Sequence, residues 1–419
     1  MDPVKIKKAR KEWNVPVSDF AMNTFNPIRS IVDGMKLTPN PQKEMIALSI
    51  GDPTVFGNLP VPEAAEEAVV EALKNRSYEK SRAAVAEYVS TPTTKMEAKD
   101  VILCSGCSGA LDLCVTALAN PGQNILMPRP GFSIYKTLAE SMGVVVKTYD
   151  LLPEKNWEVD LQHLTDLIDG NTAAIIVNNP SNPCGSVYSK QHLEDILAIA
   201  AQYKVPIIAD EIYEHFVFDG YHYYSMASLT NEVPILSCGG LTKRFLVPGW
   251  RLGWIIVYDQ NGVLSEIRDG LASLSQRILG PNTLIQAALP DILKNTPPEF
   301  FHNTIQYIQQ NAELFYKRFT KIPGLKPVMP QGAMYMMVGV DMPSFPEFKS
   351  DVQFTEKMVT EQSVFCLPAS CFQYPGYFRV VLTVPAGKVN EACDRIEEFC
   401  RSHYRPGNTP REAMETNGN

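Results

Sequence analysis

The sequence lacks the features that mark membrane proteins, secreted proteins and nucleic-acid-binding proteins. No apolar run in its 419 residues approaches the roughly 18 residues that a membrane helix needs. The basic N-terminal stretch MDPVKIKKARKEW has no apolar core, so it is not a secretory signal. We expect a solvated arm there, with a mitochondrial transit peptide as the alternative. The net charge of -8 at pH 7 argues against nucleic-acid binding, which normally needs a basic excess.

The sequence also offers little for a metal ion or a disulfide framework. Six histidines are scattered along the chain without an HExxH motif. Cys104 and Cys107 have CxxC spacing, but no second CxxC pair or histidine cluster accompanies them, so we expect no metal site. The nine cysteines lie mostly in apolar segments, and an odd number there indicates reduced thiols in a reducing compartment. We therefore expect a cytoplasmic protein.

Short apolar runs alternate with helical patterns through the middle of the chain. DVILCSG, NILMP, AAIIVNN, VPIIAD and PILSCGG are typical of strands, and SKQHLEDILAIAAQY, with a serine cap, is typical of a helix. Strands that are apolar throughout and alternate with helices predict a mostly parallel sheet with helices on both faces. The predicted fold class is therefore α/β.

The pattern changes after about residue 283. A long amphipathic helix over residues 297–322 is suited to joining two domains, and the strands and helices that follow predict a smaller α+β domain. We divide the chain into four parts. They are an N-terminal arm with the start of the small domain (1–50), a large domain (51–300), a C-terminal small domain (301–405) and a disordered tail (406–419).

Polar segments follow four of the predicted strands. They are CSGCSG, NNPSNPCG, ADEIYE and GGLTKR. Ligands of open parallel sheets bind at the carboxyl ends of the strands, so these segments are expected to meet at one edge. This convergence is stronger support for a site than any one of the motifs.

Lys243 and Asp210 suggest which ligand this edge binds. A lysine partly removed from water becomes a nucleophile towards carbonyls, and Lys243 directly follows an apolar strand. Asp210 ends another strand, where a buried carboxylate is costly unless it faces a cation. A lysine for an aldehyde, a carboxylate for a pyridinium nitrogen and a phosphate site are the requirements of pyridoxal 5'-phosphate, the expected cofactor.

Four further residues match the ring and the substrate. Tyr213 and Asn182 are candidates for the ring hydroxyl, although Asn-Pro is also ordinary turn chemistry. Phe132 could stack on the planar ring, with a place in the core as the alternative. Arg379 is a charge inside an apolar run, and such charges usually have a partner. A substrate α-carboxylate would serve, and an internal Asp or Glu is the alternative.

The phosphate candidates lie in two segments. Ser105, Gly106 and Cys107 fall where a strand becomes a helix, and the free N–H groups and positive end of a helix favour a phosphate. Arg251 could add a guanidinium fork to the same group. We interpret the Gly-Gly pair before Lys243 as allowing the strand edge to approach that phosphate closely.

These residues lie in segments that resemble the fold-type-I pyridoxal-phosphate-dependent aminotransferases. The resemblance is carried by SIGDPTVFGNLP, CSGCSGALDLC, IIVNNPSNPCG, IIADEIY, GGLTKRFLVPGWRLGW, SQRILGP, GAMYMMV and FRVVLTVP, and it extends from about residue 18 to 404. It implies that Lys243 bonds to the cofactor aldehyde and later moves a proton, that Gly51 lines the substrate site, and that Arg379 binds the substrate α-carboxylate. It also implies a homodimer with active sites at the subunit interface.

The resemblance is closest to members that act on tyrosine. It implies transfer of the amino group of L-tyrosine to 2-oxoglutarate, giving 4-hydroxyphenylpyruvate and L-glutamate, the first step of tyrosine catabolism. Two alternatives stay open. One is a broader aromatic, alanine or kynurenine aminotransferase, or a carbon–sulfur lyase with the same cofactor. The other is a cofactor-binding protein with little catalysis, because the loop before Ser81 is shorter than in relatives and leaves only Tyr78 to reach the neighbouring subunit's phosphate.

Overall fold

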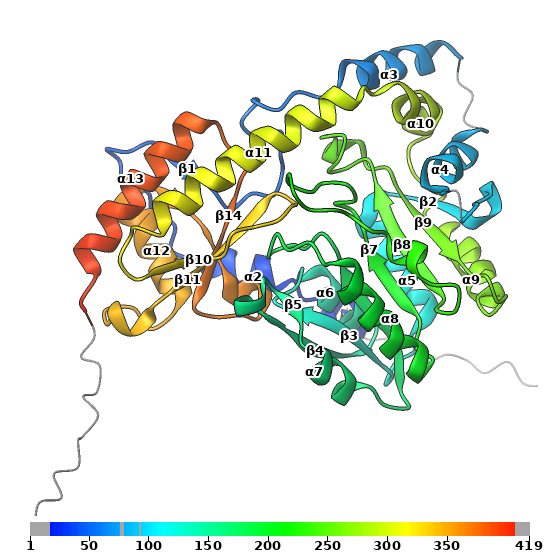
Figure 1. Cartoon of the computed structure of the whole chain (residues 1–419), viewed down its shortest axis with the longest axis horizontal. Coiled ribbons are helices and arrows are strands. Elements are labelled where there is room, and N and C mark those ends of the chain that lie inside the picture. Colours follow the sequence, from blue (N-terminus) through cyan, green and yellow to red (C-terminus); the bar gives the residue numbers. More distant parts are fainter. Residues whose placement is uncertain (1–16, 76–78, 92–93, 407–419) are drawn as a thin grey trace, which may run out of the picture.

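The computed structural model describes residues 17–75, 79–91 and 94–406. Tyr78 and most of the predicted tail lie outside the described residues. The described chain has a large part built on an eight-stranded sheet and a smaller part built on a four-stranded sheet (Figure 1). The predicted α/β class, with a smaller α+β region, is confirmed.

The large sheet is mixed but mostly parallel in its centre. Strands β8, β7, β6, β3 and β4 run parallel to one another, whereas β9 lies antiparallel between β2 and β8, and β5 is antiparallel to β4. In spatial order the strands are β2 (Val101–Cys104), β9 (Gly253–Tyr258), β8 (Ile235–Gly240), β7 (Ile207–Asp210), β6 (Thr172–Asn178), β3 (Asn124–Arg129), β4 (Val145–Leu152) and β5 (Glu158–Val159).

Helices cover both faces of this sheet, which explains why its strands are apolar throughout. Along β7, Ile208 packs with α5 on one face, whereas Ile207 and Ala209 pack with α8 on the other. Successive side chains of a strand point to opposite faces, so every position of a doubly covered strand is buried. The first face carries α5 (Gly106–Leu118), α6 (Ile134–Ser141) and α9 (Ser265–Ser275), and the second carries α7 (Leu161–Leu167) and α8 (Lys190–Tyr203).

A third group of helices packs at the β2–β9 edge. Ala65, Ala68 and Ala72 are buried on one side of α3, where small side chains allow α10 to approach closely. Trp254 and Ile256 of β9 complete this cluster. The helices are α3 (Glu63–Asn75), α4 (Ser81–Val89) and α10 (Thr283–Asn295).

The smaller sheet is antiparallel and is covered by the C-terminal helices. Its order is β10 (Leu325–Pro327), β11 (Tyr335–Val340), β14 (Tyr377–Val381) and β13 (Leu367–Pro368). It packs with α11 (Pro298–Phe319), α12 (Asp351–Gln362) and α13 (Ala386–His403). The long helix α11 runs from the smaller part towards α3 and α10, as expected for an element that joins two regions (Figure 1). None of the described helices is long and apolar enough to cross a membrane.

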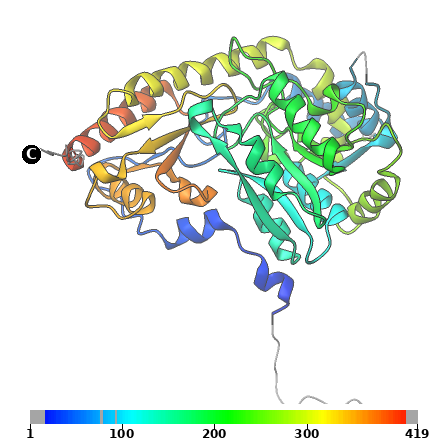
Figure 2. The ribbon, with the colours of Figure 1, turned by 60° about the horizontal axis from the view of Figure 1, so that its bottom comes forward.

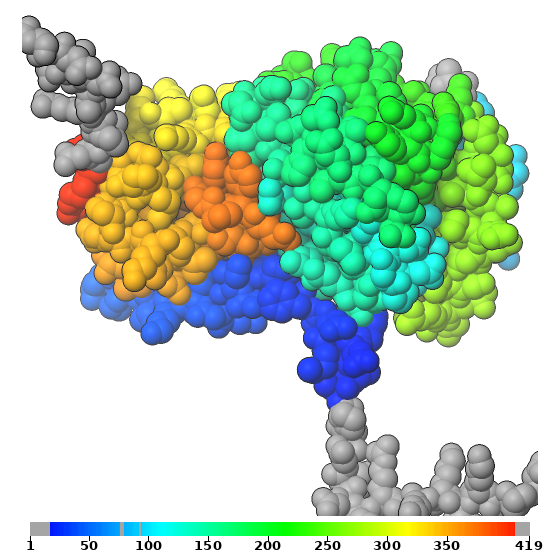
Figure 3. Space-filling view, turned by 90° about the horizontal axis from the view of Figure 1, so that it is seen from below, coloured from blue at the N-terminus to red at the C-terminus, as the bar shows by residue number. Residues whose placement is uncertain are grey.

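The N-terminal segment lies against both parts of the molecule. Helix α1 (Asp19–Asn23) contacts α6, and α2 (Pro27–Gly34) contacts a short 3-10 turn of the smaller part, Ala369–Phe372. Strand β1 (Ile46–Ala47) then pairs in parallel with β12 (Val364–Phe365). Figures 2 and 3 show this segment in blue along the underside of the molecule. The other 3-10 turns are Ala98–Asp100, Pro153–Lys155, Met226–Leu229, Pro248–Trp250 and Met342–Ser344.

Candidate active site

A cavity of about 610 Å³ lies at the carboxyl ends of the central strands, between the large sheet and the smaller part. It brings together residues from segments more than 300 positions apart in the sequence. Nine predicted site residues line it: Gly51, Cys107, Phe132, Asn182, Asp210, Tyr213, Lys243, Arg251 and Arg379. Ser105 and Gly106 do not line it, but they directly precede Cys107 at the start of α5.

Asp210 forms the base of the cavity and is only 2% exposed. Its carboxylate accepts hydrogen bonds from the Tyr135 hydroxyl at 2.5 Å, the Ile212 N–H at 3.3 Å and the Cys107 thiol at 3.5 Å. Burial raises the pKa of Asp210, while the hydrogen bond from Tyr135 opposes that rise. The Cys107 side chain is thus directed at Asp210, and only its backbone is left for a phosphate.

Lys243 follows β8 and lies half-buried in the cavity wall. Its Nζ donates a hydrogen bond of 2.6 Å to the carbonyl oxygen of Gly51, and it lies 5.9 Å from the centre of the Tyr213 ring. A Cβ atom at Gly51 would lie 2.6 Å from the Tyr335 hydroxyl, so a larger residue would not fit there. Lys243 and Gly51, which were each predicted to belong to the site, are therefore in direct contact.

The interpretation of the Gly-Gly pair before Lys243 as space for a ligand is wrong. A Cβ atom on Gly239 would lie 2.6 Å from Nε1 of Trp254, and one on Gly240 would lie 2.7 Å from the carbonyl oxygen of Leu252. Both neighbours belong to the chain around β9. The two glycines therefore allow β8 and β9 to pack closely, and neither lines the cavity.

The start of α5 and Arg251 together form a place for an anion. Ser105 is the N-cap residue but makes no side-chain cap, so it leaves the amides of the first turn to other partners. Gly106 has φ +71, and a Cβ atom there would lie 2.2 Å from the Arg251 guanidinium. Arg251 donates to the carbonyl oxygens of Ser105, at 3.1 Å, and Pro248, at 3.0 Å, and remains exposed. Helix amides beside a guanidinium suit a phosphate.

Arg379 is 4% exposed, and no Asp or Glu of the described residues forms an ion pair with it. It donates to Oδ1 of Asn182 at 2.9 Å and to the carbonyl oxygen of Ser49 at 2.8 Å, whereas its Nε has no partner in the described part of the chain. The internal-acid alternative for Arg379 is therefore wrong. A buried guanidinium with neutral partners is well suited to an incoming carboxylate.

Tyr335 is a cavity residue that the sequence did not reveal. Its hydroxyl is hydrogen-bonded to that of Tyr213 at 2.8 Å, and its ring centre lies 4.2 Å from Cζ of Arg379. Burial alone would raise the pKa of Tyr335, but the cations of Lys243 and Arg379 outweigh it and bring the pKa below its ordinary value. GAMYMMV reads only as an apolar strand, so the one signal available was its place among the resembling segments. Tyr135 was missed because it lies in an ordinary helical pattern, which contains no signal for a site residue.

The charges of the cavity favour a ligand with several negative groups. Among its described lining residues, Asp210 is the single acid, against four basic side chains: Arg29, Lys243, Arg251 and Arg379. Such an excess of one sign in a concave site attracts the opposite charge. The lysine, the buried acid and the anion place at α5 fit pyridoxal 5'-phosphate, which needs all three. No cluster of three or more His, Cys, Asp or Glu side chains suited to a metal occurs in the described residues.

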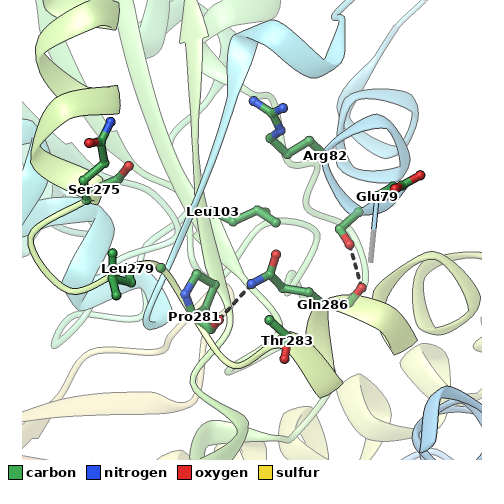
Figure 4. A pocket seen from close by; sticks show the side chains of 11 residues that line it. Glu79, Arg82, Leu103, Ser275, Leu279, Pro281, Thr283 and Gln286 are labelled. Atoms are coloured by element: carbon green, nitrogen blue, oxygen red, sulfur yellow. Dashed lines mark hydrogen bonds between the residues drawn. The ribbon is translucent and has the colours of Figure 1, made fainter. Parts of the chain in front are cut away.

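A second hollow, of about 540 Å³, lies at the β2 edge of the sheet (Figure 4). Its wall includes Glu79, Arg82, Leu103 and Gln286, and Nε2 of Gln286 donates to the carbonyl oxygen of Pro281 at 2.8 Å. None of the predicted site residues lines it. The candidate active site is therefore the larger cavity that contains Lys243.

Comparison with known proteins shows the family over most of the chain. The family model "Aminotransferase class I and II" matches residues 43–396. The chain is 59% identical to a tyrosine aminotransferase of Homo sapiens, over 96% of this chain and 91% of that protein. It is 47% identical to a tyrosine aminotransferase of Dictyostelium discoideum, over 95% of this chain and 99% of that protein.

A solved structure is similar over nearly the full length. The crystal structure of a tyrosine aminotransferase from Leishmania infantum superposes with a TM-score of 0.90 at 33% sequence identity. The match covers 94% of this chain and 100% of that chain. The likeness therefore includes both the large sheet and the smaller part.

Proposed function

The chain belongs to the aminotransferase class I and II family, and on this premise we propose that it transfers the amino group of L-tyrosine to 2-oxoglutarate. The products are 4-hydroxyphenylpyruvate and L-glutamate, and the reaction begins tyrosine breakdown and, with it, phenylalanine breakdown. The cofactor of this enzyme is pyridoxal 5'-phosphate. One observation carries the proposal. A single cavity holds the Lys243 amine, the Asp210 carboxylate and the buried Arg379, which has no Asp or Glu partner among the described residues.

When bound, pyridoxal 5'-phosphate supplies an aldehyde that combines with amines and a ring that spreads negative charge from the substrate Cα. Lys243 would hold the cofactor through its aldehyde and, as a free amine, would move the proton of the substrate Cα. The carbonyl oxygen of Gly51, which accepts from Nζ at 2.6 Å, orients this amine in the cavity.

The base of the cavity holds the ring of the cofactor. Asp210 would keep a positive charge at the ring nitrogen, and its three hydrogen-bond donors fix its orientation. Tyr213 and the amide nitrogen of Asn182 hold the ring hydroxyl, because Oδ1 of Asn182 is already used by Arg379. Phe132 lies half-buried on the wall, where its ring would pack against a planar cofactor.

The two ends of the bound molecules are held by the two arginines. Arg251 and the backbone amides of Ser105, Gly106 and Cys107 hold the cofactor phosphate. Arg379 receives the α-carboxylate of the amino acid, which replaces its neutral partners with a charged one. The backbone of Gly51 lines the same end.

We also propose that the protein is a homodimer and that it is located in the cytoplasm. The proposed domain limits of each subunit are 1–50, 51–300 and 301–405. Exposed apolar side chains support an interface with a second copy, since Ile278 is 68% and Leu279 is 88% exposed beside the second hollow. Phe20 and Met22 of the N-terminal segment are also exposed. The pairing of β1 with β12 supports placing the N-terminal residues with the small domain.

A half-reaction tests the proposed donor. L-Tyrosine is added to the purified holoenzyme without an oxo acid, and the visible absorption of the cofactor and the release of 4-hydroxyphenylpyruvate are followed. We expect a rapid change in both with tyrosine and a slower one with alanine. Formation of ammonia and pyruvate from cystathionine would instead favour a carbon–sulfur lyase. An absorption band that tyrosine leaves unchanged would contradict the proposal.

A further inference from the structure

A chain of three side chains lies behind the cavity and joins the two turns that carry Lys243 and Tyr213. Nη1 of Arg244 donates a hydrogen bond of 2.7 Å to the hydroxyl of Tyr88, and that hydroxyl donates one of 2.8 Å to Oε1 of Glu214. Arg244 directly follows Lys243, and Glu214 directly follows Tyr213. None of the three lines the cavity, and the proposed function gives them no part.

The two turns are joined by little else, because strands β7 and β8 end before them. Each turn closes on itself through a local backbone hydrogen bond. The Phe216 N–H donates to the carbonyl oxygen of Tyr213 at 2.9 Å, and the Leu246 N–H donates to that of Lys243 at 3.2 Å. Such local bonds shape each turn but do not fix one turn relative to the other.

Tyr88 is held in place by its helix and by aromatic packing. Helix α4 packs against α10 and β2. The Tyr88 ring packs edge-on against Trp254 of β9, with ring centres 6.1 Å apart. Arg244 lies over the rings of Tyr88 and Phe301, with Cζ 5.7 Å and 4.5 Å from their centres. The hydroxyl of Tyr88 is therefore a fixed point between the two turns.

The charges at the two ends of the chain strengthen it. The Arg244 cation and the hydrogen bond from Tyr88 both oppose the rise that burial causes in the pKa of Glu214. In the part of the chain that the structure describes, no direct ion pair joins Arg244 to Glu214, so the Tyr88 hydroxyl is the link between them. A hydroxyl that accepts from a cation is a stronger donor to its own acceptor, so the two hydrogen bonds reinforce each other.

We propose that Tyr88 is a positioning residue for the reaction, because its hydroxyl holds Lys243 and Tyr213 in a fixed relation to each other. This inference rests on the proposed function, in which Lys243 holds the cofactor and Tyr213 holds its ring hydroxyl. Nζ of Lys243 lies 5.9 Å from the centre of the Tyr213 ring, and this is the spacing that the chain maintains. Without the Tyr88 hydroxyl both groups remain present, but their turns are free to shift apart.

The pH dependence of the visible absorption of the holoenzyme reports this spacing. The lysine nitrogen joined to the cofactor takes up a proton, which is held by negative charge on the ring oxygen. A hydrogen bond from Tyr213 to that oxygen competes for the same charge, so weakening it raises the midpoint of the titration. The other charged or titratable groups that act on Tyr213 are Asp210, Tyr335 and Arg379, and a substitution of Tyr88 leaves all three in the protein.

Four variants of the holoenzyme test the inference by this titration. Tyr88→Phe keeps the ring and loses the hydroxyl, and we expect its midpoint to rise by about one pH unit, a tenfold change in proton affinity. Tyr213→Phe should give a rise at least as large. Tyr88→Phe added to Tyr213→Phe should give no further rise, because Tyr88 acts through the Tyr213 hydroxyl. Tyr149→Phe is the matched control. It loses a buried hydroxyl that donates to the carbonyl oxygen of Ile176 at 2.7 Å, and its midpoint should equal that of the wild-type enzyme.

Kinetics provide a second measurement. In Tyr88→Phe, kcat for tyrosine should fall about tenfold while KM changes far less, because Tyr88 does not line the cavity. An equal fall in kcat in Tyr149→Phe would show that the loss of any buried hydroxyl has this effect, and it would overturn the inference.

The titration separates this inference from the proposed function. An unchanged midpoint in Tyr88→Phe, together with a raised one in Tyr213→Phe, would overturn the inference and leave the proposed function intact. A rise caused by Tyr88→Phe that is the same with and without the Tyr213 hydroxyl would also overturn it. An unchanged midpoint in Tyr213→Phe would refute both the inference and the role of Tyr213. The tyrosine half-reaction of the wild-type enzyme tests the proposed function separately.

Discussion

The floor and the rim of the cavity are built in different ways. We define the floor as Asp210, Tyr213, Tyr335 and Arg379, all of which are buried and make hydrogen bonds to other parts of the chain. The rim contains Arg29 and Arg251, which are exposed. Arg251 contacts only backbone carbonyls through its side chain, and Arg29 has no side-chain partner among the described residues.

This difference separates two kinds of effect. Electrostatic interactions are stronger where water is excluded, so a change in the floor should alter the chemistry and the charge states of its neighbours. A change in the rim should alter the affinity for anionic ligands by smaller factors, because solvent screens those charges. Lys243 is half-buried between the floor and the rim, so a change there should alter both the chemistry and the affinity for ligands.

The largest effect is expected from Lys243→Ala. The variant loses the amine that binds the aldehyde and moves the proton, so turnover of tyrosine should fall by more than about 10³-fold. The visible absorption of the lysine-bound cofactor should disappear even where the cofactor is retained by its phosphate. Both are measured by spectroscopy and by product formation. Turnover comparable to that of the wild-type enzyme would refute the role of Lys243. It would also refute the distinction between the floor and the rim of the cavity.

A moderate effect is expected from Tyr335→Phe, which tests the floor alone. The variant keeps a ring over Arg379 but removes the hydroxyl shared with Tyr213, so kcat should fall by about tenfold with a smaller change in KM. In the protein freed of cofactor, where Lys243 is a free cation, the ultraviolet absorption of tyrosinate should lose one group that titrates below the ordinary pKa, because the cations of Lys243 and Arg379 outweigh the effect of burial.

A matched control is Tyr335→Leu, which also removes the ring over Arg379. It should raise the KM for tyrosine more than Tyr335→Phe does, since Arg379 loses the nearer of its two aromatic partners and keeps only Phe372. If both variants retain the tyrosinate titration of the wild-type enzyme, the low pKa belongs to another residue. The floor would then not act as a unit.

The smallest effect is expected from Glu211→Gln, directly behind the floor. Glu211 is buried and accepts hydrogen bonds from the Ser237 hydroxyl at 2.5 Å and the Met226 N–H at 3.0 Å. Burial raises its pKa from 4.5 to about 7. Between these two pH values the folded state holds a proton that the unfolded state has lost. The contribution of Glu211 to the free energy of unfolding therefore falls as the pH rises from 4.5 to about 7.

The prediction is checked by denaturant unfolding at several pH values. The stability of the wild-type enzyme relative to Glu211→Gln should decline from about pH 4.5 to about pH 7 and then level off. Glu154→Gln, on the surface beside β4, is a control that should leave the pH dependence unchanged. A constant difference across the range would mean that Glu211 remains ionised in the folded protein.

The sequence was most informative where the site follows directly from strand ends. Asp210 ends β7 and Lys243 follows β8, and these two strands are parallel neighbours in the sheet. The two residues therefore lie at the same sheet edge because of the strand order alone. Tyr335 and Arg29 reach the same cavity from the smaller sheet and from the N-terminal helix, and no local pattern marks them. The Gly-Gly pair was misread because local flexibility looks the same whether the close neighbour is a ligand or, as here, the side chain of Trp254.

The pairing of β1 with β12 sets an order of events during synthesis. Ile46 emerges early, yet its partner Val364 is made about 300 residues later, which takes from roughly a quarter of a minute to a minute at common translation rates. Arg29 precedes this strand and Gly51 follows it, so their final positions also depend on this late pairing. The wall of the cavity that the N-terminal segment provides is therefore completed last, after the large sheet has had time to form. An unfinished chain carries the catalytic lysine but lacks its closed pocket.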